Sequence, residues 1–242
     1  MEQIIYHKTA ASEDVHWWFI GRRFIIDQVI KMLSLPMTAD ILEVGCGSGG
    51  NLPLLAGYGN VYGMEPEDTA REYAQKRKIG TVLAGSLPDE IPFNEQLFDL
   101  IVMTDVLEHL TDDQLALQRL YPKLKTGGYI LITVPAFPFL WSKHDELHHH
   151  KRRYTMKRLR AILLNAGYDI VKASYLNFIM FPAIAGLRLT RKFIGKTDTD
   201  DLRMYPAMIN RWLAKLFASE GYLLRYVALP FGLSLLGVGR KV

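Results

Sequence analysis

The sequence predicts an α/β fold, namely a doubly wound, seven-stranded and mostly parallel sheet with helices on both faces and a helical, hydrophobic C-terminal insertion. Two observations predict it. From Asp40 to Val134, short runs rich in β-forming residues alternate with helical stretches, which is typical of sheets built from β-α-β units. After residue 175, the chain carries two apolar stretches, each interrupted by a proline. We therefore expect one domain over residues 1–242.

The expected strands are short and are bounded by glycine, proline or polar residues: 41–44, 61–64, 81–84, 98–103, 129–134, 168–175 and 232–236. Helices are expected over residues 12–33 and 155–166, and from Thr111 to about Lys125. Thr111 and Gln114 have the spacing of a capping box, in which two side chains satisfy free amides at the start of a helix. This spacing predicts that the helix ending near Lys125 begins at Thr111.

Charge is distributed unevenly along the chain, whose formal net charge is +4. Residues 1–150 hold 12 Lys and Arg against 20 Asp and Glu, which gives −8, and residues 151–242 hold 17 against 5, which gives +12. The basic part could meet anionic lipid head groups, an acidic substrate or nucleic acid, or simply solvate helix faces. Cys46 is the only cysteine, so no intramolecular disulfide can form, and we expect a cytoplasmic protein.

A glycine-rich turn follows the first expected strand, in the run Glu43-Val44-Gly45-Cys46-Gly47-Ser48-Gly49-Gly50-Asn51. Glycines allow a positive φ and a close approach of the backbone to a ligand, so this turn predicts a nucleotide-type cradle. Glu43, at the carboxyl end of the strand, could bind a cationic ammonium and would repel a pyrophosphate. Glu65 ends the second strand, where an acid can accept hydrogen bonds from ribose hydroxyls.

The run from Glu43 to Gly49 resembles the E-x-G-x-G-x-G motif of class I, Rossmann-like methyltransferases, and Glu65 matches their ribose-binding acid. Residues 98–109 and the Leu124 to Tyr129 turn are also similar to that family. Ser86 departs from it, because many relatives have Asp or Glu at this position. The resemblance implies S-adenosylmethionine as cofactor, bound by Glu43, Gly45, Cys46, Gly47, Gly49, Asn51, Glu65, Pro66, Gly85, Ser86, Leu87, Thr104, Asp105, Val106 and His109.

The segment after the fifth strand, residues 135–154, is rich in aromatic and titratable side chains. It resembles the W-S-x-H-D-x-x-x-x-H-x-R-R-Y-T segment of methyltransferases found beside glycan and lipid biosynthesis genes. The resemblance implies a small or lipid- or glycan-linked acceptor, methylated on a hydroxyl or a carbon. A neutral histidine could remove a hydroxyl proton, so His150 and His144 are candidate bases, with Asp145 orienting one of them.

Further residues are candidates for binding the acceptor, on the pattern of that segment and of an H-W-W-F-x-x-R-R element near the N-terminus: Trp17, Trp18, Trp141, Arg152, Arg153 and Tyr154. His144, Asp145, His148 and His150 are acceptable metal ligands by type. The resemblance calls for no metal, however, and we predict none. Neighbouring histidines on an extended loop also tend to point apart.

The parts of the domain then follow from these assignments. Residues 1–39 are expected to form a helical cap, 40–175 the cofactor-binding core, 176–229 a helical lid, and 230–242 the final strand. The apolar stretch 177–187 is too short to span a bilayer, and 222–238 contains Arg225 and Pro230. The lid could still touch the inner face of a membrane peripherally.

Three other functions remain open on the sequence. Gly45, Gly47 and Gly50 also satisfy the G-x-G-x-x-G pattern of an NAD(P)-dependent oxidoreductase, although that cofactor has no use for Glu43. A catalytically inactive binding module would tolerate any sequence in the 135–154 segment. A methyltransferase acting on RNA or another nucleic acid would use the basic C-terminal part, but the chain carries no recognisable RNA-binding appendage.

Overall fold

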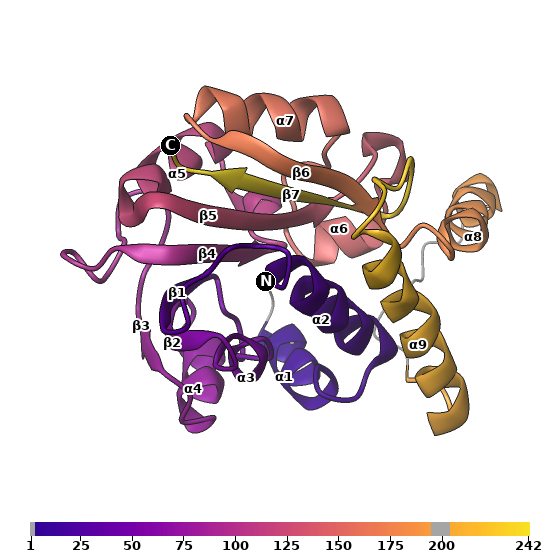
Figure 1. Ribbon diagram of the computed structural model, residues 1–242. Helices are drawn as coiled ribbons and strands as arrows, with labels where there is room; N and C mark the ends of the chain where they lie inside the picture. Colours follow the sequence, from indigo (N-terminus) through magenta and orange to yellow (C-terminus); the bar gives the residue numbers. More distant parts are fainter. Residues whose placement is uncertain (1–2, 195–203) are drawn as a thin grey trace.

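The fold was examined in a computed structural model, which describes residues 3–194 and 204–242. One seven-stranded sheet forms its centre, with the strand order β3-β2-β1-β4-β5-β7-β6 (Figure 1). Strands β1 to β5 pair in parallel, and β7 is antiparallel to both β5 and β6. The predicted fold class is confirmed. The strands are β1 (Ala39–Val44), β2 (Gly59–Met64), β3 (Thr81–Leu83), β4 (Phe98–Thr104), β5 (Leu124–Pro135), β6 (Asp169–Leu176) and β7 (Ser234–Arg240).

Helices cover both faces of the sheet, because successive residues of a strand point to opposite sides. Ile41 of β1 belongs to a buried cluster that includes Phe217, whereas the next residue, Leu42, belongs to a second cluster with Leu117 and Leu159. The helices are α1 (Gln3–Ser12), α2 (Trp17–Ile30), α3 (Leu52–Leu55), α4 (Asp68–Lys76), α5 (Asp113–Leu120), α6 (Lys143–Leu147), α7 (Met156–Asn165), α8 (Phe181–Ile194) and α9 (Ala207–Leu223), with 3-10 turns η1 (Leu107–His109), η2 (Tyr121–Lys123) and η3 (Pro138–Leu140).

Two predicted helices differ from the observed ones. The helix expected over residues 12–33 is shorter in the structure, where α2 covers residues 17–30. The preceding helix α1 ends at Ser12, and the His16 side chain caps the start of α2 by accepting from the Trp18 amide at 3.3 Å. The predicted capping box is wrong. Asp112 caps α5 by accepting from the Leu115 amide at 2.8 Å, and Gln114 instead donates to the carbonyl of Ile162.

The same helix was expected to continue to about Lys125, but α5 ends at Leu120. Pro122 lies in the 3-10 turn η2, and a proline has no amide hydrogen to continue an α-helix. Strand β5 then begins at Leu124, five residues before the predicted start, and the register of its pairing with β4 shifts at the beginning of the strand.

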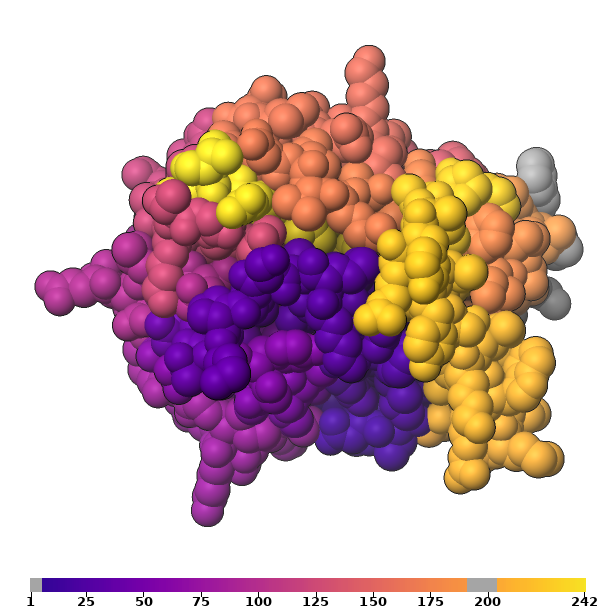
Figure 2. Space-filling model, viewed as in Figure 1, coloured from indigo at the N-terminus to yellow at the C-terminus, as the bar shows by residue number. Residues whose placement is uncertain are grey.

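The C-terminal region contributes two helices before the chain returns to the sheet as β7, between β5 and β6. Helix α9 packs against α2 (Figures 1 and 2), where the Trp17 and Phe217 rings meet edge to face at 6.1 Å. Residues 195–203, inside the expected lid, lie outside the described residues. In the part of the chain that the structure describes, no helix is long and apolar enough to cross a bilayer.

Candidate active site

The glycine-rich turn leads directly from β1 into the connection before α3. Gly45, Gly47 and Gly49 all have a positive φ, at 64°, 54° and 83°. A Cβ atom on Gly45 would lie 2.7 Å from a methyl group of Val106, whereas one on Gly47 would meet nothing within 4 Å. The spacing of the left-handed residues follows E-x-G-x-G-x-G, and the open space at Gly47 is where a ligand can approach the backbone.

Glu43 ends β1 at the floor of a cavity and is fully buried. Its Oε1 accepts a 2.7 Å hydrogen bond from Asn51 Nδ2, which also donates to Thr104 Oγ1 at 3.2 Å. Its Oε2 has no hydrogen-bond partner among the described residues. Burial raises the pKa of Glu43 to about 8. A cationic ammonium would satisfy Oε2 and favour the charged carboxylate, so this site fits the amino-acid end of S-adenosylmethionine.

Glu65 follows the end of β2 and is held by two backbone amides. Its carboxylate accepts from the amides of Gly47 at 2.9 Å and Glu67 at 3.1 Å, and these bonds fix it against the glycine-rich turn. Burial raises its pKa above the ordinary value. Tyr6 of α1 lies over this end of the cavity, and its pKa is raised to about 12 by burial and by the charges of Glu65 and Glu67.

The cavity has a volume of about 620 Å³ and lies at the carboxyl ends of β1, β4 and β5, where ligands bind in open α/β sheets. Helices α1 and α8 lie in the expected cap and lid, but their cavity-lining residues were not among the predicted site residues, because no local pattern shows which side chains of a helix face the sheet edge: Tyr6, Thr9, Ile184, Leu187 and Arg188. Predicted site residues that line the cavity are Trp17, Trp18, Glu43, Gly45, Cys46, Gly47, Asn51, Thr104, Asp105, His109, His144, His150 and Arg153.

Other predicted cofactor residues lie outside this lining. Val106 packs against Gly45, and the Ser86 backbone pairs with Glu90 in a short bridge. The residues outside the lining follow four different strands: Gly49 comes after β1, Glu65 and Pro66 after β2, Gly85, Ser86 and Leu87 after β3, and Val106 after β4.

Asp145 lies beneath the cavity and is completely buried. Its Oδ1 is 2.9 Å from His150 Nδ1 and 2.8 Å from Arg153 Nε, and its Oδ2 accepts from the Ser142 amide at 2.8 Å. Burial alone would raise the pKa of Asp145, but the hydrogen bonds from His150 and Arg153 hold it well below its usual range. Because the ionised carboxylate only accepts hydrogen bonds, His150 donates to it through Nδ1.

Four histidines gather on this side of the cavity. The ring centroids of His144 and His148 are 4.1 Å apart, and those of His109 and His150 are 4.8 Å apart. Burial and the neighbouring imidazoles lower the pKa of His109 to about 3 and that of His148 to about 4, and they lower the pKa of His144 well below its ordinary value. These three imidazoles are therefore neutral at physiological pH. The tendency of adjacent histidines to point apart does not hold here.

Glu108 was not predicted as a site residue, although it precedes His109 in the turn after β4. It is completely buried against the cavity, and neither carboxylate oxygen has a hydrogen-bond partner within residues 3–194 and 204–242. Burial, followed by the charge of Asp105, raises its pKa well above the ordinary value. An acid beside a histidine at the carboxyl end of a central strand was the available signal in the sequence.

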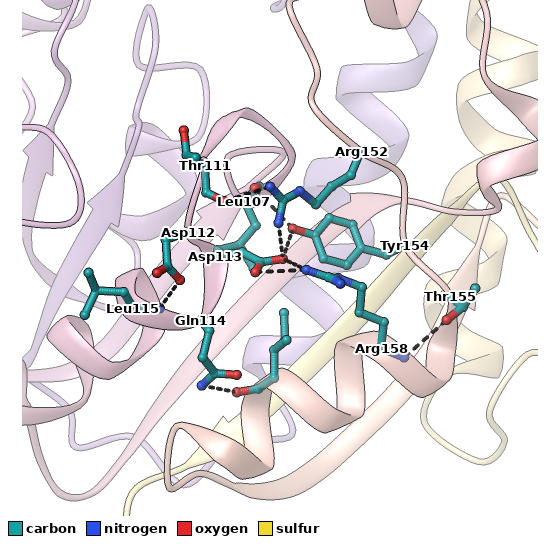
Figure 3. A network of polar contacts seen from close by, with 11 residues as sticks. Leu107, Thr111, Asp112, Asp113, Gln114, Leu115, Arg152, Tyr154, Thr155 and Arg158 are labelled. Atoms are coloured by element: carbon teal, nitrogen blue, oxygen red, sulfur yellow. Dashed lines mark hydrogen bonds and ion pairs between the residues drawn. The ribbon is translucent and has the colours of Figure 1, made fainter.

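The structure corrects the prediction that Arg152 and Tyr154 bind the acceptor. Both point to Asp113, at the start of α5 (Figure 3), outside the residues that line the cavity. The Tyr154 hydroxyl donates to Asp113 at 2.8 Å, and Arg152 and Arg158 form ion pairs with the same carboxylate at 3.2 and 2.9 Å. Burial of Tyr154 in this network makes it a structural residue. Trp141 also lies outside the lining.

The N-terminal segment covers the cavity from the other side. The Arg22 guanidinium lies 4.3 Å from the centre of the Trp18 ring and forms an ion pair with Asp105. The Trp17 amide donates to Asn210 of α9 at 2.9 Å, which connects this cover to the C-terminal helices. Trp17 and Trp18 therefore line the cavity, and their binding of the acceptor stays a prediction.

Comparison with known proteins identifies the class. Residues 17–173 match the family described as a methyltransferase domain, and the chain belongs to that family. A Mycolicibacterium smegmatis protein named "Probable S-adenosylmethionine-dependent methyltransferase" is 25% identical over 134 residues, which are 54% of this chain and 52% of that protein. The mitochondrial ubiquinone biosynthesis O-methyltransferase of Rattus norvegicus is 33% identical over 102 residues, which are 38% of this chain and 30% of that protein.

Among solved structures, phosphoethanolamine N-methyltransferase 2 of Haemonchus contortus, in complex with S-adenosyl-L-methionine, has a similar fold. Its TM-score is 0.58 at 18% identity, and the match covers 88% of this chain and 51% of that chain. The chain spans about half or less of the length of the two curated relatives. Residues 17–173 therefore form a methyltransferase domain, and the buried Glu43 carboxylate suits the ammonium of S-adenosylmethionine rather than the pyrophosphate of NAD(P).

Proposed function

We propose that this enzyme transfers the methyl group of S-adenosylmethionine to a hydroxyl or a carbon of a small, or lipid- or glycan-linked, metabolite, with a hydroxyl as the favoured acceptor. The observation that carries the proposal is the group of partly buried histidines that shares one cavity with Glu43, together with the Asp145 carboxylate that holds His150 in place. A hydroxyl must lose its proton when it is methylated, and neutral imidazoles can accept a proton near physiological pH.

Methyl transfer from a sulfonium is an in-line displacement. The bond between the acceptor oxygen and the methyl carbon forms as the carbon–sulfur bond breaks, and its electron pair remains on a neutral thioether. Holding donor and acceptor in line can supply roughly 7–11 kcal/mol in favourable cases. A base then adds about 10²–10⁴-fold, and His150 and His144 are the candidates for it. Asp145 orients His150 through the 2.9 Å hydrogen bond to Nδ1.

The chemical character of the acceptor follows from the α8 side of the cavity. Ile184 and Leu187 add apolar surface there, next to Arg188, and Trp18 lines the cavity from α2. The same volume of about 620 Å³ has to hold the donor as well as the reacting part of the acceptor. These features favour a small acceptor, or the polar end of a larger molecule whose apolar part lies along α8.

We also propose that the enzyme works in the cytoplasm, with peripheral contact to the inner face of the membrane. Large apolar side chains are exposed on and after α9, including Met208 at 83%, Trp212 at 63% and Tyr226 at 84%. Over residues 204–242, Glu220 is the only acid, and it is buried. Apolar residues beside basic ones favour an anionic lipid surface. Co-sedimentation with phospholipid vesicles tests this contact. We expect the protein to sediment with anionic but not with neutral vesicles, and Trp212→Ala to reduce the bound fraction. Sedimentation of the same fraction with and without anionic vesicles would contradict the contact.

The proposed reaction can be tested with labelled S-adenosylmethionine and matched acceptors that differ only in carrying a hydroxyl, a carbon nucleophile or an amine. We expect label to enter the hydroxyl compounds in the wild type and to be greatly reduced in Glu43→Gln. Glu72→Gln is a matched control, because Glu72 is 68% exposed and forms an ion pair with Lys76 on the surface of α4. Labelling of amines alone would overturn the assignment of a hydroxyl or carbon acceptor.

A further inference from the structure

Three potential metal ligands converge at the floor of the cavity. Glu108 and His109 come from the η1 turn after β4, and His150 comes from the loop after α6. One ligand atom from each residue lies within 4.8 Å of the other two. The Lys151 amide donates to the Glu108 carbonyl at 2.7 Å, so a backbone hydrogen bond holds the two segments at this distance.

The buried Glu108 carboxylate lacks the contacts that would stabilise its charge. Both oxygens are buried and lack a hydrogen-bond partner among the residues described. The nearest cations are engaged by other acids, because Arg22 pairs with Asp105 and Arg153 with Asp145. Leaving a buried carboxylate without partners is unfavourable, unless it is protonated or a cation binds it. A divalent cation would satisfy both oxygens.

The two nitrogen donors lie side by side. The rings of His109 and His150 meet edge to face, with their centres 4.8 Å apart. Metals bind an imidazole through a ring nitrogen that carries no proton. His150 donates through Nδ1 to Asp145, which itself accepts from Arg153, so Nε2 is the nitrogen available to a ligand. A carboxylate behind a histidine is the common arrangement around metal-bound histidines, where it fixes the tautomer and the ring orientation. Asp145 would therefore be a positioning residue.

Against the expectation from the family resemblance, which called for no metal, we propose that Glu108, His109 and His150 bind one divalent transition-metal ion and leave coordination positions open towards the cavity. Two imidazoles and one carboxylate suit ions such as Zn²⁺, Co²⁺ or Fe²⁺. The proposal deepens the proposed function and rests on it in one respect: the acceptor hydroxyl would take an open position as a ligand. Its proton then passes to the neighbouring imidazole of His144 or His148. The oxygen forms its bond to the methyl carbon as the carbon–sulfur bond breaks, and the metal keeps its oxidation state.

This site also separates the roles of the histidines. With His150 bound to the metal through Nε2, the proton acceptor has to be another ring of the group. The His144 and His148 rings are centred 5.9 and 5.8 Å from that of His150, close enough to serve an acceptor bound beside the metal. The alternative occupant beside Glu108 is the ammonium group of an amine acceptor, which the experiment has to distinguish.

The test is a titration of the chelator-treated full chain with Co²⁺, followed by its visible absorption and by calorimetry, without any acceptor. We expect one ion per chain. Glu108→Gln and His109→Gln should each weaken binding by at least about tenfold, and Asp145→Asn by about 10–100-fold, which is the usual effect of changing the partner behind a metal-bound histidine. His149→Asn is the matched control, because His149 is exposed, has a φ of 55° that asparagine tolerates, and lies outside the group of ligands.

Circular dichroism and the S-adenosylmethionine affinity of the same samples show whether each variant is folded. The proposal is overturned if the wild type binds no Co²⁺, or if both ligand variants are folded and bind it as the wild type does. It is also overturned if ethanolamine binds in a Glu108-dependent manner while Co²⁺ does not. If hydroxyl methylation continues in excess chelator, the metal has no part in the reaction, and the proposed function stands. If Co²⁺ binds as expected but no hydroxyl is methylated, the metal site stands, and the proposed function is overturned.

Discussion

The two halves of the cavity are built in different ways. The cofactor half uses one continuous stretch, in which Glu43, three left-handed glycines and Asn51 follow one another within nine residues. The acceptor half combines side chains from the η1 turn, the loop around α6, and helices α2 and α8. The first half therefore binds a ligand shared by a large family, while the second can change with the acceptor without disturbing the sheet.

Charge also differs between the two halves. In the cofactor half, the buried Glu43 carboxylate has one oxygen without a hydrogen-bond partner among the described residues, which suits an ammonium. In the acceptor half, imidazoles gather beside Glu108, whose two oxygens likewise lack a hydrogen-bond partner within the described ranges, and this is where the proposed reaction removes a proton. Substitutions in the first half should therefore change binding, and substitutions in the second should change turnover.

The largest effect is expected at His150. Replacing it with alanine should lower turnover by about 10²–10⁴-fold, because it removes either a base or a metal ligand, while S-adenosylmethionine affinity stays within about threefold. Steady-state kinetics and calorimetry of the same preparation measure the two quantities. A variant with unchanged turnover would show that His150 has no part in the reaction. Equal losses of turnover and of S-adenosylmethionine affinity would contradict the assignment of binding to one half of the cavity and turnover to the other.

The next effect is expected at Glu43. Glu43→Ala should weaken S-adenosylmethionine binding by about 10- to 100-fold, because a hydrogen bond to a charged group contributes about 1.5–3 kcal/mol. Calorimetric titration measures the affinity, with the surface variant Glu72→Gln as control. Wild-type affinity in a folded Glu43→Ala protein would mean that the ammonium binds elsewhere.

Binding of the cofactor should also release a proton at this residue. The pKa of Glu43 is raised to about 8, so at pH 6.5 the free enzyme holds a proton there, and an arriving ammonium favours the ionised form. We expect release of about one proton per site at pH 6.5, decreasing as the pH rises above 8. Calorimetry in buffers of different ionisation enthalpy measures it. The release should be absent in Glu43→Gln, and its persistence there would assign the proton to another group.

The smallest of these effects is expected outside the cavity. Tyr154→Phe removes the 2.8 Å hydrogen bond to Asp113 and should lower the free energy of unfolding by about 1–3 kcal/mol, with kcat and KM nearly unchanged. Urea denaturation measures the stability. Tyr226→Phe is the control, since Tyr226 is 84% exposed and its change should stay within about 0.5 kcal/mol. A marked change in the KM for the acceptor in Tyr154→Phe would show that Tyr154 takes part in acceptor binding.

The accuracy of the sequence analysis differs in the same way between the two halves. The glycine turn could be predicted residue by residue, because a positive φ is a local property of Gly45, Gly47 and Gly49. Arg152 and Tyr154 could not, because only the packing of α5 beside the 151–155 segment shows that Asp113 is their partner. Glu108 was missed for a related reason: a lone acid in a turn shows its importance only once burial leaves it without partners.

By itself, the sequence determined the order of strands and helices, the left-handed turn and the acid that precedes it, because hydrophobic periodicity and glycine act over a few neighbouring residues. The tertiary structure decided which titratable side chains meet. His109 and His150 are 41 positions apart, and Trp17 and Asn210 are 193 apart, yet each pair is in contact. Such contacts arise from burial of both faces of the sheet, and that process brings distant segments together without leaving a local pattern in the chain.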